Sequence, residues 1–169
     1  MRLDCKLTDA LTVGNILNNL SVGTDLVTSL CGNFLGEGST RSVFEYNLDP
    51  KYVIKIERDN TSCNLVEEMM WEEIKDLCGD LTFVKNWFAP VKWVSPNGKI
   101  LVMERTYDEP QVRKGAKTPR RPDRIPKFLW DVKAANFGWI GKNYVCHDYG
   151  QFYNFIHYPK AMQKADWSF

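Results

Sequence analysis

Three polar residues in the C-terminal third of the chain have the types and spacing of a phosphoryl-transfer site. Asp131 and Asn136 lie five positions apart, and Asp148 follows Asn136 by twelve positions. A carboxylate that can accept a proton, together with two oxygen ligands for Mg2+, is what metal-assisted phosphoryl transfer requires. Asp and Asn are also common loop caps, so each residue taken singly fits either interpretation.

Gly36 and Gly38 form a second candidate, a glycine loop between two strand-like segments. Two glycines one residue apart let backbone amides approach phosphate oxygens without a side-chain clash. The loop lacks the Gly-Lys-Ser/Thr of a Walker A sequence, and a strand rather than a helix follows it, which excludes a dinucleotide-binding fingerprint. An ordinary hairpin turn has the same composition, so the loop alone decides nothing.

Lys55 is the one charged residue in an otherwise apolar strand, Tyr52 to Ile56. In an alternating strand it can simply point to solvent. Alternatively, a helix carboxylate holds the ammonium so that it meets the phosphates of a nucleotide. Glu67 is the preferred partner over Glu68, because apolar residues follow Glu67 at the three-, four- and seven-residue spacing of one helix face.

The elements that must position these residues alternate between helical and strand spacing. Residues 1–33 have the caps and apolar spacing of two short helices, and residues 64–77 have the spacing of a third helix. The other segments have the composition of strands and tight turns. We expect an antiparallel meander over 34–57, a strand at 83–84, a hairpin over 91–103 with its turn at 96–98, and a hairpin over 136–146.

Length and composition indicate a single soluble globular domain. The chain has 169 residues, of which 44% are hydrophobic, and a chain of this size buries roughly 70% of its unfolded surface. Five cysteines without disulfide-framework or zinc-ligand spacing suggest reduced thiols in a cytoplasmic protein. No segment approaches the ~18 apolar residues of a membrane span, so we expect no membrane partner.

Residues 108–127 form a basic, proline-rich linker. Seven cations and three acids give it a local charge of +4, whereas 22 basic and 21 acidic residues leave the whole chain at +1. The cations are Arg113, Lys114, Lys117, Arg120, Arg121, Arg124 and Lys127. The Arg113–Lys127 segment is either a solvated, mobile loop or a docking surface for an acidic partner. Nucleic acid is one such acidic partner, but nothing in the near-neutral charge of the whole chain favours it, so we do not expect it.

Taken in this order, the motifs resemble those of the protein kinase family and are similar to the minimal kinases of bacterial effectors and phages. Five segments carry the resemblance: the glycine-rich loop at Gly36-Glu37-Gly38 followed by Val43, the strand lysine Lys55, the helix glutamate Glu67, the catalytic loop from Asp131 to Asn136, and the metal-binding segment Asp148-Tyr149-Gly150. Between them, Leu101 to Thr106 resembles the last N-lobe strand running into the hinge.

The resemblance implies an α+β, protein kinase-like fold with an antiparallel N-lobe sheet, one helix and a strongly reduced C-lobe. Within a single domain of residues 1–169, it implies an N-terminal helical extension at 1–33, an N-lobe at 34–107, the basic linker at 108–127 and a reduced C-lobe at 128–169.

It also implies ATP and Mg2+ as cofactors and a role for each candidate residue. The catalytic group would be Asp131, Lys133, Lys55 and Glu67. The nucleotide would be bound by Gly36, Glu37, Gly38, Val43, Lys55, Met103, Glu104 and Thr106, and the metal by Asn136 and Asp148.

The sequence departs from the family pattern in three places. Arg41 replaces the third loop glycine, which stiffens the loop and adds a cation near the phosphates. Leu129-Trp130 stands where His-Arg usually precedes the catalytic aspartate, which puts the usual activation-loop control in doubt. Only 19 residues follow Gly150, too few for the helices that normally hold peptide substrates.

Two functions fit these observations. One is a minimal kinase-like phosphotransferase that moves the γ-phosphate of ATP to a protein hydroxyl, of Ser or Thr rather than Tyr. The other is a pseudokinase-like interaction module that binds and inhibits a partner protein, with or without nucleotide. The complete set of five chemical groups favours the first function, and the missing substrate-holding helices favour the second.

Overall fold

The computed structural model describes residues 29–58, 61–151 and 160–167. The two helices expected within residues 1–33 therefore lie almost entirely outside the described residues. The chain divides into two compact units, the first made of Met1–Glu68 and Val91–Glu104 and the second of Met69–Pro90 and Arg105–Phe169. Of the helices in the described part, none is long and apolar enough to cross a membrane.

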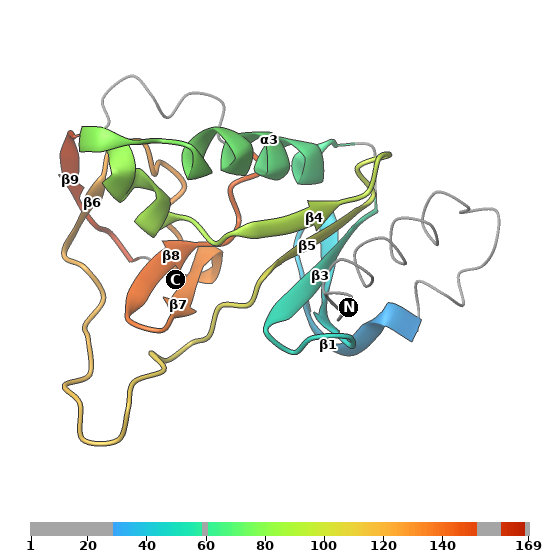
Figure 1. Cartoon of the computed structure of the whole chain (residues 1–169), viewed down its shortest axis with the longest axis horizontal. Coiled ribbons are helices and arrows are strands. Elements are labelled where there is room, and N and C mark those ends of the chain that lie inside the picture. The colour runs from blue at the N-terminus through green and yellow to red at the C-terminus, as the bar shows by residue number, and fades with distance from the viewer. Residues whose placement is uncertain (1–28, 59–60, 152–159, 168–169) are drawn as a thin grey trace, which may run out of the picture. The chain divides into compact units, whose positions relative to one another are not determined.

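The first unit is built on a five-stranded antiparallel sheet with strand order β1-β2-β3-β5-β4, and the chain has the expected α+β class (Figure 1). The strands are β1 (Cys31–Glu37), β2 (Arg41–Tyr46), β3 (Tyr52–Glu57), β4 (Val91–Val94) and β5 (Ile100–Glu104). The expected meander and the 91–103 hairpin are thus confirmed, although β1 begins three residues earlier than expected.

The two faces of β3 have different surroundings, because successive side chains of a strand point to opposite faces of the sheet. Ile54 lies in a core cluster with Leu30, Tyr46, Ile100 and Val102. Lys55, the next residue, points to the opposite face, where it is buried. The interpretation in which Lys55 points to solvent is therefore wrong.

Helix α3 (Cys63–Lys75) follows β3 and agrees with the helix expected over 64–77 to within two residues at each end. Glu57, the last residue of β3, is buried and accepts hydrogen bonds from the Thr61 hydroxyl and the Asn64 amide at the start of the helix. Burial alone would raise the pKa of Glu57. The hydrogen bonds from Thr61 and from the first backbone amides of the helix together have the larger, opposite effect, so the pKa of Glu57 is lower than its ordinary value. An ionised carboxylate is favourable at a helix N-terminus, so Glu57 fixes where α3 begins.

The prediction of a strand at residues 83–84 is wrong. These residues belong to a 3-10 helix, η1 (Gly79–Trp87), which begins at a glycine with φ 57°. The Thr82 hydroxyl donates to the Gly79 carbonyl at 2.8 Å, and Val84 is the one residue of the helix that is buried. A pair of apolar residues supplies too short an alternation to specify a strand against these local turn contacts.

The second unit contains two short antiparallel sheets of two strands each. In one, β7 (Phe137–Ile140) pairs with β8 (Asn143–Cys146) across Gly141, as expected, and the glycine adopts a left-handed φ of 58°. In the other, β6 (Arg124–Pro126) pairs with β9 (Met162–Lys164), a contact that the sequence did not indicate. A single 3-10 turn, η2 (Ala134–Asn136), leads directly into β7.

Aromatic side chains form much of the core of the second unit. Phe137 stacks on Tyr144 at a centroid distance of 5.8 Å, and Trp167 packs edge-on against both rings. Trp139 is buried, whereas Trp130 is 58% exposed and does not belong to the core.

Candidate functional site

Lys55 and Glu67 form a buried ion pair in the first unit. The Lys55 Nζ donates to Glu67 Oε1 at 3.1 Å and to Oε2 at 2.9 Å. The Lys55 side chain is 4% exposed, and that of Glu67 is fully buried. The expected choice of Glu67 rather than Glu68 as the partner is confirmed, because Glu67 is on the face of α3 that faces β3.

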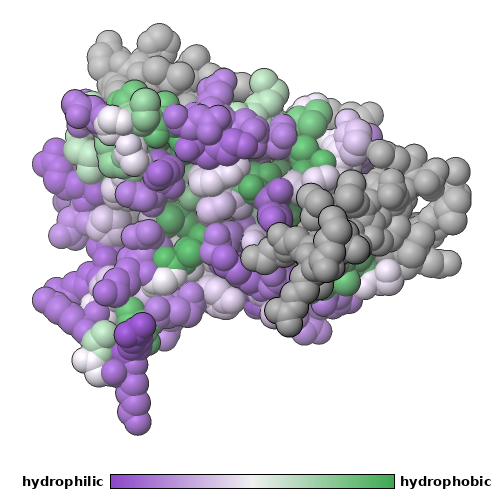
Figure 2. All heavy atoms as spheres, viewed as in Figure 1, coloured by the Kyte–Doolittle hydropathy of each residue, from purple (hydrophilic) through white to green (hydrophobic). Residues whose placement is uncertain are grey.

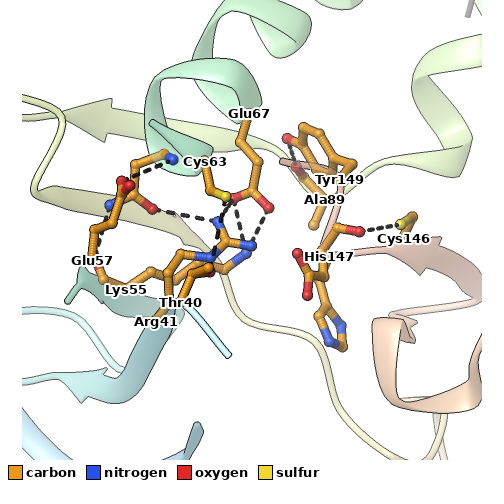
Figure 3. A network of polar contacts seen from close by, with 12 residues as sticks. Thr40, Arg41, Lys55, Glu57, Cys63, Glu67, Ala89, Cys146, His147 and Tyr149 are labelled. Carbon is orange, nitrogen blue, oxygen red and sulfur yellow. Dashed lines mark hydrogen bonds and ion pairs between the residues drawn. The ribbon is translucent and has the colours of Figure 1, made fainter. Parts of the chain in front are cut away.

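Arg41 is a second cation on the same carboxylate, which the sequence did not reveal. Its Nη1 lies 2.8 Å from Glu67 Oε2, and its side chain is 7% exposed. The same Nη1 lies 3.4 Å from Asn64 Oδ1. Figure 3 shows the Lys55 and Arg41 side chains converging on Glu67. We expected Arg41 to add a cation near the phosphates, but its guanidinium is instead engaged by α3.

The electrostatics of this cluster favour an ionised Glu67. Burial alone would raise the pKa of Glu67, but the charges of Lys55 and Arg41, and the hydrogen bonds that both donate, together lower the pKa below its ordinary value. The carboxylate therefore remains charged at neutral pH and keeps both cations oriented.

The glycine loop connects β1 to β2 directly before Arg41. The Gly38 amide donates to the Arg41 carbonyl at 2.9 Å, which closes a tight turn. Arg58 holds the outer side of the loop, since its guanidinium donates to the Gly38 carbonyl and lies 3.2 Å from a carboxylate oxygen of Glu37. The loop is therefore anchored on one side by an exposed arginine and continues on the other into a buried one.

The residues expected to contact the base lie in or directly after the strands of the sheet. Val43 on β2 pairs with Lys55 on β3, and Met103 on β5 is fully buried. Glu104 ends β5, with Lys51 at 3.6 Å from its carboxylate. Thr106 follows in the second unit.

Asp131, Lys133 and Asn136 are brought together in the second unit by one short turn. The Asn136 Nδ2 donates to Asp131 Oδ2 at 2.8 Å, and the Lys133 Nζ lies 3.1 Å from Asp131 Oδ1. Backbone bonds within the turn, from Lys133 N to Asp131 O and from Asn136 N to Lys133 O, fix the spacing of the three residues. Both oxygens of the Asp131 carboxylate are thus oriented by residues of the expected catalytic group and metal site.

Asp148 is exposed but lies between two anchored residues. Tyr149, the next residue, is fully buried, and its hydroxyl donates to the Ala89 carbonyl at 2.7 Å. On the other side, the Cys146 thiol donates to the Asp148 carbonyl at 3.3 Å (Figure 3). The backbone that carries the Asp148 carboxylate is therefore held on both sides.

His147 links three segments of the second unit, a role that we did not expect from the sequence. Its backbone amide donates to the Asn136 carbonyl at 2.9 Å, and its Nε2 donates to the Ala135 carbonyl at 3.0 Å. Its Nδ1 lies 2.7 Å from the Thr106 hydroxyl. The ring thereby ties the turn that carries Asn136 to Thr106, and the only sequence signal for this role is its position next to Asp148.

The donor set of Asn136 and Asp148 fits Mg2+ bound together with a nucleotide. Because Asn136 donates through Nδ2 to Asp131, its Oδ1 is the atom that remains to ligate a cation. Mg2+ prefers oxygen ligands and is usually held by one or two protein side chains, with water and phosphate oxygens completing the shell. Among the described residues, no cluster of three or more His, Cys, Asp and Glu side chains could hold a metal ion unaided.

Comparisons with known proteins add no family assignment. No protein-family model, no curated protein and no solved structure matches the chain.

Proposed function

We propose that this protein is a minimal kinase-like phosphotransferase that uses ATP and Mg2+ and moves the γ-phosphate to a protein hydroxyl, of Ser or Thr rather than Tyr. The observation that carries this function is the buried ion pair between Lys55 and Glu67. Burying two charges is costly, and hydrophobic residues in the same space often give a more stable protein. A ligand-binding role for the Lys55 ammonium therefore explains the presence of this buried pair better than a contribution to fold stability does.

In this function, Glu67 holds the Lys55 ammonium for the α- and β-phosphates of ATP, and the amides of Gly36 to Gly38 cover those phosphates. The fold itself does not require either loop glycine. A Cβ at Gly36 or Gly38 would meet no atom within 4 Å, and neither residue has a positive φ. Glycine at these two positions is instead explained by a phosphate that binds close to the backbone, where a side chain would be in the way. Val43, Met103 and the backbone of Glu104 and Thr106 would enclose the base.

The cluster in the second unit would act on the transferred phosphoryl group. Asp131 accepts the proton of the attacking hydroxyl, and Lys133 neutralises charge at the γ-phosphate. Asn136 and Asp148 would hold Mg2+, which supplies positive charge against the phosphate oxygens. Catalysis of this kind rests mainly on positioning and on charge neutralisation, which a small scaffold can provide.

We place this activity in the cytoplasm. The described cysteines Cys31, Cys63, Cys78 and Cys146 are all free. Thiols remain reduced in that compartment.

A second candidate function is a pseudokinase-like module that binds and inhibits a partner protein, with or without nucleotide. The basic segment Arg113–Lys127 favours it, because all seven cations there are exposed and, within the described part of the chain, none forms an ion pair. The segment is drawn yellow to orange in Figure 1, and the same region of Figure 2, at the lower left, is mostly hydrophilic with a few neutral and apolar residues among the polar ones. Residues 108–127 contain no aromatic side chain on which bases could stack, so an acidic polypeptide is the partner that we propose.

The experiment for the proposed function measures nucleotide binding and phosphate transfer on the same samples. Wild type should be stabilised by Mg2+ and ATP in a thermal-shift titration, by about 2.7 kcal/mol at 100 times the dissociation constant. Lys55→Met should reduce this stabilisation, whereas Lys92→Met, at an exposed lysine of β4, should not. Transfer of labelled γ-phosphate, to the chain itself or to a partner, would then separate the kinase from the binding module. The absence of any ATP-dependent shift in wild type would leave only a nucleotide-free binding module.

A further inference from the structure

Arg41 occupies a position that connects two parts of the first unit. It is the first residue of β2, directly after the glycine loop, and its carbonyl accepts the Gly38 amide that closes the loop. Its guanidinium reaches α3, where Nη1 lies 2.8 Å from Glu67 Oε2. The backbone of this residue therefore holds the loop, and its side chain holds the helix.

Asn64 extends the connection to a third element. Its Oδ1 lies 3.4 Å from Arg41 Nη1, and its Nδ2 donates to the Gly98 carbonyl in the β4–β5 turn at 2.9 Å. Asn64 is fully buried, and a Cβ at Gly98 would lie 2.7 Å from Leu65 Cγ, so the turn and the first turn of α3 are packed against each other. The network thus joins loop, helix and sheet through buried polar contacts.

Lys55 and Arg41 approach the same oxygen of Glu67, at 2.9 Å and 2.8 Å. A displacement of α3 that breaks the Lys55 contact also removes the partner of the Arg41 guanidinium. If the glycine loop opens and the start of β2 moves, Glu67 in turn loses its contact with Arg41. Buried polar networks of this kind are strongly coupled, because a partly satisfied network is unfavourable in a low-dielectric interior.

We propose that Arg41 is a positioning residue that couples the glycine loop to helix α3, so that the loop and the Lys55–Glu67 pair are ordered in a single step. This consequence rests on the proposed function: ATP affinity should depend on Arg41, although the Arg41 guanidinium contacts Glu67 and acts on the nucleotide only through the coupling. The coupling also orders the Lys55–Glu67 pair without a modified activation loop, since the side chains of Arg41, Lys55 and Glu67 all belong to the first unit.

Hydrogen–deuterium exchange on the full chain, without nucleotide, tests the coupling directly. Arg41→Met should raise exchange both in the loop, residues 36–41, and in α3, by about tenfold or more, because it removes one partner from a buried charge cluster. Arg58→Met is the matched control, since Arg58 holds the other side of the same loop and has no described contact with α3. It should raise exchange in the loop only.

Arg41→Lys keeps a positive charge beside Glu67 but replaces the planar guanidinium, whose Nη1 faces both Glu67 and Asn64, with a compact ammonium. It should give exchange in both segments between the values for wild type and Arg41→Met, and it keeps the question answerable if Arg41→Met does not fold. Exchange in α3 that is unchanged in Arg41→Met, or in Arg41→Lys where only that variant folds, would overturn the coupling.

Nucleotide titrations separate this coupling from the proposed function. In wild type, Mg2+ and ATP should slow exchange in the loop and in α3 together. In Arg41→Met, ATP should bind about tenfold or more weakly, with Arg41→Lys restoring part of the affinity. If ATP protects no segment of wild type, the proposed function fails, whereas the nucleotide-free exchange still decides the coupling. If ATP binds Arg41→Met as tightly as wild type, the coupling has no effect on the site and the inference fails.

Discussion

The ammonium of Lys55 lies 2.9 Å from a carboxylate oxygen of Glu67 across twelve residues of sequence, and neither side chain is accessible to solvent beyond a few per cent. Arg41 binds the same oxygen, so one Glu67 carboxylate holds both cations and keeps a cationic partner when either of them is removed. This asymmetry makes the consequences of removing each residue different.

We expect Glu67→Gln to destabilise the fold more than Lys55→Met. Removing Glu67 leaves two buried cations facing a neutral amide, at a cost of about 3–5 kcal/mol, whereas removing Lys55 leaves Glu67 paired with Arg41. Urea unfolding of both variants at neutral pH measures the difference. The reverse order would show that Arg41 does not neutralise Glu67.

Acid should weaken the fold partly through Glu67. Its pKa is lower in the folded chain than its ordinary value of 4.5, so the ionised carboxylate stabilises the fold above that value. This stabilisation is lost as pH falls below 4.5 through the folded pKa. Glu67→Gln should therefore flatten the dependence of the unfolding free energy on pH in this range, although the lowered pKa of Glu57 contributes a slope that remains. Glu68→Gln, at the next residue of α3, is the control and should leave the slope of wild type nearly intact.

Gly36 and Gly38 should tolerate alanine structurally and still matter for nucleotide. Because neither position has a positive φ or a neighbour within 4 Å of a Cβ, Gly36→Ala and Gly38→Ala should change stability by no more than about 1 kcal/mol, in the stabilising direction. Both should weaken ATP binding in a thermal-shift titration. Gly138→Ala is the contrast, since its Cβ would lie 2.6 Å from Thr106 Cβ and should destabilise the fold. Alanine variants of the loop that bind ATP as tightly as wild type would mean that the loop does not cover phosphates.

His147 should contribute to stability through its side-chain hydrogen bonds. His147→Phe removes the contacts to the Ala135 carbonyl and the Thr106 hydroxyl, so we expect a loss of about 1–3 kcal/mol in chemical unfolding. Thr106→Val removes only one of the two and should cost less. The concentration of Mg2+ needed for half-maximal ATP binding should rise in His147→Phe, because the Asn136 turn loses its tether. A variant with wild-type stability and Mg2+ dependence would show that the ring does not position the turn.

The basic segment should bind an acidic polypeptide in a salt-dependent way. We expect a synthetic Glu/Asp-rich peptide to bind wild type at low salt and to lose affinity when Arg120, Arg121 and Arg124 are all changed to Gln, because the ion pairs that would hold it disappear. A control with Lys75, Lys92 and Lys142 changed to Gln removes the same charge from exposed positions elsewhere and should bind normally. Equal binding by the two triple variants, or a preference for an oligothymidine over the peptide, would rule out this partner.

The sequence indicated most of the strands and, within each unit, candidate residues that the structure brings together, because these depend on local patterns. A short apolar run around Lys55 marked β3, and apolar spacing on the helix selected Glu67 over its neighbour. The Arg41 contact could not be predicted in the same way, since it joins residues 26 positions apart through a side-chain direction that spacing does not specify. The pairing of β6 with β9 is also non-local, and two three-residue segments carry too little pattern to indicate it.

Transfer of labelled γ-phosphate by wild type and by Asp131→Ala tests the proposed phosphotransferase most directly. Asp131 is held by Asn136 and Lys133 in the second unit, so its replacement should leave Mg2+- and ATP-dependent stabilisation in place while removing the base. We expect labelled phosphate on wild type or its partner, and none with Asp131→Ala. If both proteins bind ATP and are equally inert with every partner tried, or transfer phosphate equally well, the account of Asp131 as the base of a phosphotransferase is contradicted.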